Sequence, residues 1–223
     1  MRSVRVETKQ ESYQILIERG LLARTGSEVQ QITPPHCRKT VIVSNRRVYK
    51  EYGEVVESSL KQAGYDTAVF LMGDGERYKT LSTASRILTH LLEQRAGRHD
   101  LIVALGGGVV GDVAGFVAAT FMRGIDLVQI PTTLLAQIDS SVGGKTGVNH
   151  RLGKNLIGAF KQPRLVLIDP DTLATLPRRE LMAAMQEAVK YGAIADSELF
   201  AMLEQGNVAM EELILRCCQI KAR

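Results

Sequence analysis

Three glycines between a predicted strand and a predicted helix could bind a phosphate group. Gly106, Gly108 and Gly111 match the pattern G-x-G-x-x-G directly after the apolar run LIVAL (101–105). Glycines let backbone N–H groups approach a pyrophosphate, which the positive end of the following helix also attracts. A tight strand–helix turn without a ligand is the alternative. A simple dinucleotide-binding pattern would assign the ribose to Asp126, but Asp126 begins a predicted strand instead of ending one, which argues against that role.

A second segment, DSSVGGKTGVNHRLGKNLIGAF (139–160), combines glycines with charged and amide side chains and shows little apolar periodicity. Because it cannot bury itself as core, it forms either a solvated surface loop or the lining of a pocket. Lys145 and Lys154 would supply positive charge for a phosphate, and Asn155 would offer a donor and an acceptor to sugar hydroxyls. Asp139 begins the segment. The functional interpretation is a pocket lined for phosphate and hydroxyl groups.

The GGKT sequence at 143–146 contains only the end of the P-loop motif of ATPases. The full motif requires a glycine separated from Gly144 by four residues, and Asp139 stands there instead. The preceding residues, TLLAQIDSS, favour a helix, whereas a P-loop directly follows a strand. The sequence therefore argues against an ATPase of this class.

Charged residues in predicted helices are further candidates. Glu187 and Lys190 share a face of the predicted helix that contains residues 178–195, and the nearest neighbours of Glu187 are apolar. A surface ion pair at i,i+3 would explain both residues. The alternative is a metal-binding carboxylate with a catalytic lysine one turn away. Arg123, which follows an apolar helix, is either an anion-binding residue or a cation that the helix C-terminus favours.

Alternating strands and helices must position these residues. Period-two alternation over the first seventeen residues predicts an antiparallel hairpin. Further strands are expected at 39–45, 67–72, 101–105 and 126–130, and helices at 46–63, from 81 to near Gly97, and at 113–121. This order predicts βαβ units and a mostly parallel sheet.

The pattern becomes helical after about Pro170. Helices are predicted at 176–195, at 197–205 and, with Asn207 as N-cap, at 208–223. We therefore expect an α/β domain over residues 1–175 and the beginning of a helical domain over 176–223. The last helix is still apolar-periodic at Ile220 and has no glycine or proline stop, so we expect the natural sequence to continue.

Composition restricts the class of protein. The 223 residues are 45% hydrophobic and 23% charged, with a formal charge of +4, which is typical of a globular protein. The sequence has no Trp and no block of five like charges, so it lacks the marks of a nucleic-acid binder. Its apolar runs are too short to span a membrane, and it has no secretory signal. Its three cysteines, Cys37, Cys217 and Cys218, make no disulfide framework, which favours the cytoplasm.

Five segments together resemble the 3-dehydroquinate synthases of the shikimate pathway, which are sugar phosphate cyclases. These segments are GDGERYKT (73–80), GGGVVGDVAGFVAATFMRGI (106–125), PTTLLAQIDSSVGGKTGVNH (131–150), GKNLIGAFKQP (153–163) and TLPRRE to KYG (175–192). They occur in the family's order. The resemblance implies a Rossmann-like domain that binds NAD, followed by a helical domain that supplies most of a zinc or cobalt site, and a homodimer.

The resemblance also implies site residues. The positions that match NAD contacts are Asp74, Gly75, Glu76, Arg77, Tyr78, Lys79, Gly108, Val109, Val110, Gly111, Asp112, Thr132, Thr133, Lys145, Lys154, Thr172, Leu173, Ala174 and Thr175. The positions that match substrate and catalytic residues are Asp139, Lys145, Asn155, Lys190 and Arg123. In the family's homodimer the arginine at the position of Arg123 reaches the neighbouring subunit's substrate phosphate. Glu187 matches a zinc ligand.

The implied reaction converts 3-deoxy-D-arabino-heptulosonate 7-phosphate to 3-dehydroquinate and phosphate, and NAD ends unchanged.

The sequence departs from the family in two ways. No histidine follows Glu187, so two of three expected metal ligands are absent, and Ala184 and Gln186 replace the family's usual glycine and alanine. We therefore expect a chain that binds NAD, does not turn over alone, and exposes the apolar face of 208–223. The alternatives are a metal-dependent glycerol or alcohol dehydrogenase, a cyclase that forms another carbocycle, and a non-catalytic NAD-binding fragment.

Overall fold

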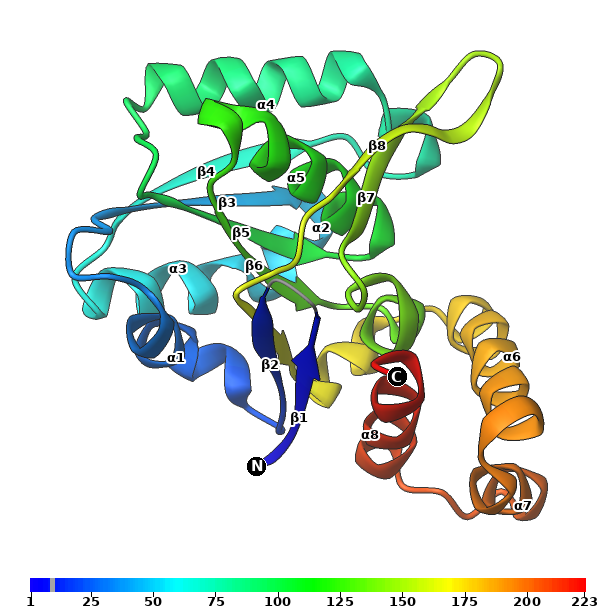
Figure 1. Cartoon of the computed structure of the whole chain (residues 1–223). Helices are drawn as coiled ribbons and strands as arrows, with labels where there is room; N and C mark the ends of the chain where they lie inside the picture. The colour runs from blue at the N-terminus through cyan, green and yellow to red at the C-terminus, as the bar shows by residue number, and fades with distance from the viewer. Residues whose placement is uncertain (9–10) are drawn as a thin grey trace.

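The computed structural model describes residues 1–8 and 11–223; residues 9–10, which fall in the predicted N-terminal hairpin, lie outside the described part. The main strands are β1 (Arg2–Glu7), β2 (Ser12–Ile17), β3 (Lys39–Asn45), β4 (Asp66–Met72), β5 (Leu101–Gly106), β6 (Asp126–Pro131) and β9 (Leu165–Ile168). They form one sheet in the order β1-β2-β9-β6-β5-β3-β4 (Figure 1). β1 pairs antiparallel with β2, and the other neighbours pair in parallel. The predicted mostly parallel sheet with an N-terminal hairpin is confirmed.

Helices follow most strands. The helices are α1 (Thr25–Ile32), α2 (Arg46–Val48), α3 (Glu54–Gln62), α4 (Leu81–Glu93), α5 (Gly108–Thr120), α6 (Arg178–Ala195), α7 (Ser197–Gln205) and α8 (Met210–Lys221). Shorter helical segments are η1 (Leu21–Arg24), η2 (Tyr49–Gly53), η3 (Glu76–Tyr78), η4 (Phe121–Arg123), η5 (Ala136–Ser140) and η6 (Pro170–Thr175). Among the described residues, no helix has both the length and the apolar character that a membrane span requires.

The central strands are apolar on both faces because helices cover both faces. Val41 of β3 and Ile102 of β5 pack with α4 and α5. Their neighbours Ile42 and Val103 point to the opposite face and pack with α1 and α3. All four side chains have no exposed surface. This two-sided burial holds the carboxyl ends of the strands in fixed positions.

A hairpin of β7 (Lys145–His150) and β8 (Gly153–Phe160) occupies most of the segment that the sequence predicted as a surface loop or pocket lining. Glycine has low strand propensity, so the pattern gave no strand signal there. The hairpin packs on α5 at Gly115, where an added Cβ would lie 2.3 Å from Cγ2 of Thr146. The close approach of α5 therefore depends on a glycine. Figure 1 shows the end of the hairpin extending away from the sheet.

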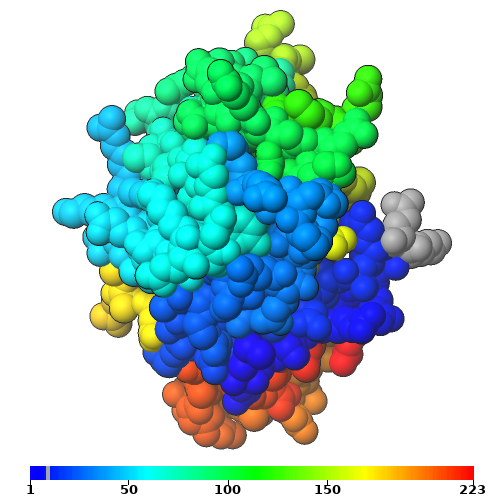
Figure 2. All heavy atoms as spheres, turned by 90° about the vertical axis from the view of Figure 1, so that its left-hand side faces the viewer, coloured from blue at the N-terminus to red at the C-terminus, as the bar shows by residue number. Residues whose placement is uncertain are grey.

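Two predictions for the last helix are wrong. α8 begins at Met210 with Ala209 as its N-cap, while the side chain of Asn207 instead donates to Oε1 of Gln205 at 3.1 Å. Its apolar face is not exposed: Leu213, Ile214, Cys217 and Cys218 are buried against β1, β2 and η5. In Figure 2 the dark-blue N-terminal residues lie beside the red and orange residues of α7 and α8, where Arg2 pairs with Glu212. Among the described residues of α6, α7 and α8, the exposed large apolar side chains lie on α6 and are Met182, Val189 and Ile194.

Candidate functional site

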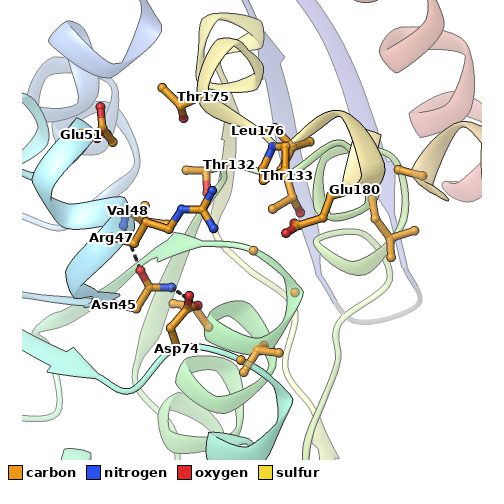
Figure 3. Close-up of a pocket in the computed structure, with 18 of the residues that line it drawn as sticks. Asn45, Arg47, Val48, Glu51, Asp74, Thr132, Thr133, Thr175, Leu176 and Glu180 are labelled. Atoms are coloured by element: carbon orange, nitrogen blue, oxygen red, sulfur yellow. Dashed lines mark hydrogen bonds between the residues drawn. The ribbon is translucent and has the colours of Figure 1, made fainter. Parts of the chain in front are cut away.

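A cavity of about 560 Å³ lies at the carboxyl ends of β3, β4, β5 and β6, and we call it the carboxyl-edge pocket (Figure 3). Its lining residues are Asn45, Arg47, Val48, Glu51, Tyr52, Gly73, Asp74, Gly75, Gly107, Gly108, Val109, Val110, Thr132, Thr133, Leu135, Thr175, Leu176, Pro177, Glu180, Ala183 and Ala184. β4 and β5 lie on opposite sides of β3, so the strand order reverses at this point. Ligands of open parallel sheets bind at such reversals.

Asn45 and Asp74 form a polar pair at one wall of the pocket. The amide Nδ2 of Asn45 donates to Oδ1 of Asp74 at 3.0 Å, and its Oδ1 accepts the N–H of Val48 at 2.8 Å (Figure 3). Asn45 thus caps α2 and orients the carboxylate that the sequence assigned to the cofactor. Asn45 was not predicted as a site residue because no motif marks it, although its place at the end of the strand KTVIVSN was a usable signal.

The N-terminus of α5 forms the floor of the pocket. Gly107 is the N-cap and no side chain caps the helix, so the N–H groups of the first turn remain available to an anion. An added Cβ at Gly108 would lie 3.0 Å from Oγ of Ser140, which shows how closely the chain passes here. Gly106 and Gly111 face Val110 and Gln129 instead, so they serve packing.

The structure gathers eight of the predicted NAD-contact residues in this pocket. They are Asp74, Gly75, Gly108, Val109, Val110, Thr132, Thr133 and Thr175. The others lie outside it. Glu76 accepts a hydrogen bond from Asn149, Arg77 stacks on Tyr78, and Tyr78 packs on Gly73. Gly111 packs on Gln129, Thr172 is buried against Asp169, and Leu173 packs against the core. Ala174 and Lys154 are exposed. Asp112 and Lys145 line a second cavity, and Lys79 pairs with Asp112.

This second cavity, of about 380 Å³, lies between the hairpin, η5 and α8, and we call it the hairpin pocket. Its lining residues are Asp112, Asp139, Ser140, Val142, Lys145, Thr146, Gly147, Asn155, Gly158, Ala159, Phe160 and Lys221. α5 connects the two sites, because Gly108 lines the first pocket and Asp112, one turn later, lines the second. Lys145, Asn155 and Asp139, which the sequence placed in one segment, therefore meet in one cavity.

Asp139 is held by two donors from the C-terminal helices. The hydroxyl of Tyr191 donates to its Oδ1 at 2.7 Å, and Nζ of Lys221 lies 2.7 Å from the same atom. Burial favours a higher pKa for Asp139, but the hydrogen bonds from Lys221 and Tyr191 outweigh it and lower the pKa. Burial, together with Asp139, raises the pKa of Tyr191. The carboxylate is therefore ionised, and its Oδ2 is available to a ligand.

Lys79 does not line the hairpin pocket itself but contacts two residues that do, Asp112 and Asn155. This lysine is only 5% exposed, and its Nζ pairs with Oδ2 of Asp112 and lies 2.5 Å from Oδ1 of Asn155. Burial raises the pKa of Asp112, and the ammonium of Lys79 partly opposes that shift. Asn155 has a left-handed backbone (φ +57°), and its N–H donates to Asn149. Lys79 therefore ties the loop before α4 to the hairpin.

Lys190, Glu187 and Arg123 lie outside both pockets. Lys190 pairs with Glu187 along α6, and its Nζ also lies 4.9 Å from the centre of the Tyr191 ring. The ion pair expected from the i,i+3 spacing is thus present. Arg123 lines a separate surface hollow that also contains Lys161. In residues 1–8 and 11–223, no three His, Cys, Asp or Glu side chains gather to hold a metal, so the described residues do not fit a complete metal site.

Comparison with a family model matches residues 69–183 to the N-terminal part of 3-dehydroquinate synthase. A 3-dehydroquinate synthase of Microcystis aeruginosa is 49% identical over 221 residues, and the match spans 95% of this chain and 60% of the relative. One from Thermodesulfovibrio yellowstonii is 49% identical over the whole chain and 64% of its own length. The chain thus spans about 60% of the length of the curated relatives that it matches.

Solved structures agree with the fold. A 2-deoxy-scyllo-inosose synthase in complex with carbaglucose-6-phosphate, NAD+ and Co2+ matches 99% of this chain and 62% of its own length, with 29% identity and a TM-score of 0.88. The 2-epi-5-epi-valiolone synthase of Streptomyces hygroscopicus, with NAD+ and Zn2+ bound, matches 96% of this chain and 61% of its own length at 30% identity and a TM-score of 0.84. A glycerol dehydrogenase of Schizosaccharomyces pombe covers 80% of the chain and 42% of its own length, is 18% identical with a TM-score of 0.63, and shares the fold alone.

Proposed function

Because the chain belongs to the 3-dehydroquinate synthase family, we propose that it carries the NAD-binding and phosphate-binding parts of such an enzyme. The reaction converts 3-deoxy-D-arabino-heptulosonate 7-phosphate to 3-dehydroquinate and phosphate. In this proposal residues 1–175 form the NAD-binding domain, and residues 176–223 begin the helical domain. The observation that carries it is the adjacency of the two pockets, which share α5 as a common wall.

The carboxyl-edge pocket fits a dinucleotide. The uncapped N-terminus of α5 offers N–H groups to a pyrophosphate, and Gly107 and Gly108 leave room for its approach. Asp74, oriented by Asn45, is placed to accept hydrogen bonds from a ribose. Bound NAD supplies a hydride acceptor that returns the hydride within one turnover.

The hairpin pocket fits a phosphorylated sugar acid. Lys145 is exposed at its lining and supplies the positive charge that a phosphate requires. Asn155 offers an amide donor, since its Oδ1 is engaged by Lys79. Oδ2 of Asp139 accepts a hydrogen bond from a substrate hydroxyl, because Tyr191 and Lys221 both contact Oδ1. Together these groups hold the phosphate and orient the sugar beside the dinucleotide.

The remaining assignments concern residues outside the two pockets. We place Glu187 as one ligand of a zinc or cobalt ion. Lys190 acts next to Asp139, and the positive charge of Lys190 helps to lower the pKa of that carboxyl group. Arg123, exposed and outside both pockets, reaches the phosphate site of a second copy in a homodimer. The cytoplasm is the proposed location.

Calorimetric titration with NAD tests the proposal. We expect the wild-type chain to bind NAD with one site, and Asn45→Ala to weaken binding about tenfold because Asp74 loses its orienting donor. Asn207→Ala, at a surface turn, is the matched control and leaves the affinity unchanged. No heat of binding at millimolar NAD would refute the proposed cofactor site. With a sugar-phosphate substrate, phosphate release without net NADH supports the synthase, whereas steady NADH formation from a simple polyol supports a dehydrogenase.

A further inference from the structure

Arg47 places a cation in the carboxyl-edge pocket that the resemblance did not assign. It lies on α2, two residues after Asn45. Its guanidinium points into the cavity towards Thr132 (Figure 3). Within residues 1–8 and 11–223, its side chain has no hydrogen bond, ion pair or ring contact. An exposed guanidinium with five donors and no protein acceptor is free to bind a ligand.

The charges around the pocket show which kind of ligand needs this arginine. Glu51, Asp74 and Glu180 bring three carboxylates to the lining, and Arg47 is the single Lys or Arg among the described lining residues. Figure 3 shows Glu180 on the wall opposite Arg47. A helix N-terminus contributes only about half a positive charge. The lining is therefore net negative even with Arg47, and Arg47 is the side-chain cation in it that can meet a phosphate group of an anionic dinucleotide.

We propose that Arg47 is a cofactor-binding residue that holds a phosphate group of the dinucleotide. This inference rests on the proposed NAD site and deepens it. Arginine binds phosphate through two parallel N–H···O bonds, which position the ligand as well as neutralise it. Two phosphates carry that chemistry: the pyrophosphate common to NAD and NADP, and the 2′-phosphate that only NADP has. The second would let the protein accept NADP although Asp74 favours an unmodified ribose.

Calorimetric titrations with NAD, NADP and adenosine distinguish these sources. The test variant is Arg47→Gln, which keeps a polar side chain without the charge. Arg46→Gln is the matched control, because Arg46 is the exposed neighbour on the same short helix and does not line the pocket. We expect Arg47→Gln to weaken dinucleotide binding at least tenfold at low salt, with a smaller effect at high salt, and to leave adenosine unaffected.

Each outcome decides a point. An equal loss for NAD and NADP assigns Arg47 to the pyrophosphate, and a loss confined to NADP assigns it to the 2′-phosphate; both support the inference. Wild-type affinity of Arg47→Gln for both dinucleotides overturns it, as does an equal loss in Arg46→Gln or for adenosine. If the wild-type chain binds neither dinucleotide, the proposed function itself fails, which is a different result from unchanged binding by the variant.

Discussion

The ammonium of Lys79 lies 2.5 Å from the amide oxygen of Asn155, a residue 76 positions later in the chain. This contact joins the loop between β4 and α4 to the hairpin of β7 and β8. The backbone repeats the connection, because the N–H of Asn149 donates to the carbonyl of Lys79 at 2.8 Å. The wall of the hairpin pocket is thus attached to the segment that also supplies Asp74 to the carboxyl-edge pocket.

Lys79→Met tests the strength of this connection. The side chains of Lys79 and Asp112 are 7% and 20% exposed, so the substitution leaves a largely buried carboxylate without its cation. We expect a loss of about 3–5 kcal/mol in the free energy of unfolding. The measurement is urea unfolding followed by circular dichroism. Adding Asp112→Leu to the variant should recover much of the loss.

Lys61→Met is the control for this pair. Lys61 also pairs with a carboxylate, that of Glu57, but its side chain is 56% exposed. Such a pair contributes only about 0–1 kcal/mol. Similar losses in Lys79→Met and Lys61→Met would contradict the role given to the buried contact.

Gly115→Ala should separate the hairpin from α5. The new Cβ would lie 2.3 Å from Cγ2 of Thr146, so the strand must move, at a cost of about 1–3 kcal/mol. Thr146→Ser removes that methyl group and keeps the hydroxyl that donates to Ala159 at 2.7 Å. We therefore expect the double variant to be more stable than Gly115→Ala alone in thermal unfolding.

Gly97→Ala is the matched control, because its nearest neighbour would be Oδ2 of Asp100 at 3.6 Å, an ordinary contact. A destabilisation of Gly115→Ala that Thr146→Ser does not reduce would show that the cost arises elsewhere in α5.

The sequence predicted the parallel sheet well because its central strands are continuous apolar runs. KTVIVSN and LIVAL became β3 and β5 with the expected bounds to within one residue. The β7–β8 hairpin escaped prediction because its few apolar residues, such as Val148, alternate with glycines and charged groups. The surface on which α8 packs could not be predicted either, because α8 packs on strands about two hundred residues earlier in the chain.

The site was predictable only in part. The glycine turn pointed to Gly108, and the resemblance pointed to Asp74 and Thr132, all of which line one cavity. Asn45 and Arg47 carry no motif, and only the sheet order brings the end of β3 next to the glycine turn. Lys79 matched a cofactor contact by sequence, but its direction towards Asn155 depends on the unpredicted hairpin.

Stability should depend on pH through Asp139. Its pKa in the folded protein lies below the ordinary value of 3.8, so its carboxylate stabilises the fold above that pH. The contribution is lost as the pH falls through the folded-state pKa. Tyr191→Phe removes one donor to this carboxylate and should cost about 1.5–3 kcal/mol at pH 7 and less at pH 3, where more of Asp139 is protonated.

Urea unfolding at both pH values measures the difference. Tyr13→Phe is the control, because the hydroxyl of Tyr13 accepts a hydrogen bond from the neutral N–H of Gly143 at 3.2 Å, and this bond does not depend on a carboxylate. An equal loss in Tyr191→Phe at pH 7 and pH 3 would show that Asp139 does not respond to that hydroxyl.

Zinc titration tests the proposal that the chain brings a single metal ligand. Glu187 pairs with Lys190, and in the part of the chain that the structure describes no three metal-binding side chains lie together. A zinc site needs three or four protein ligands, so we expect affinity weaker than micromolar and no difference between wild type and Glu187→Gln. Calorimetry in a non-chelating buffer measures this affinity. Lys190→Gln frees the carboxylate without adding a ligand, so it should not create a site. Stoichiometric zinc binding at micromolar affinity or tighter that Glu187→Gln abolishes would mean that this chain completes the metal site by itself.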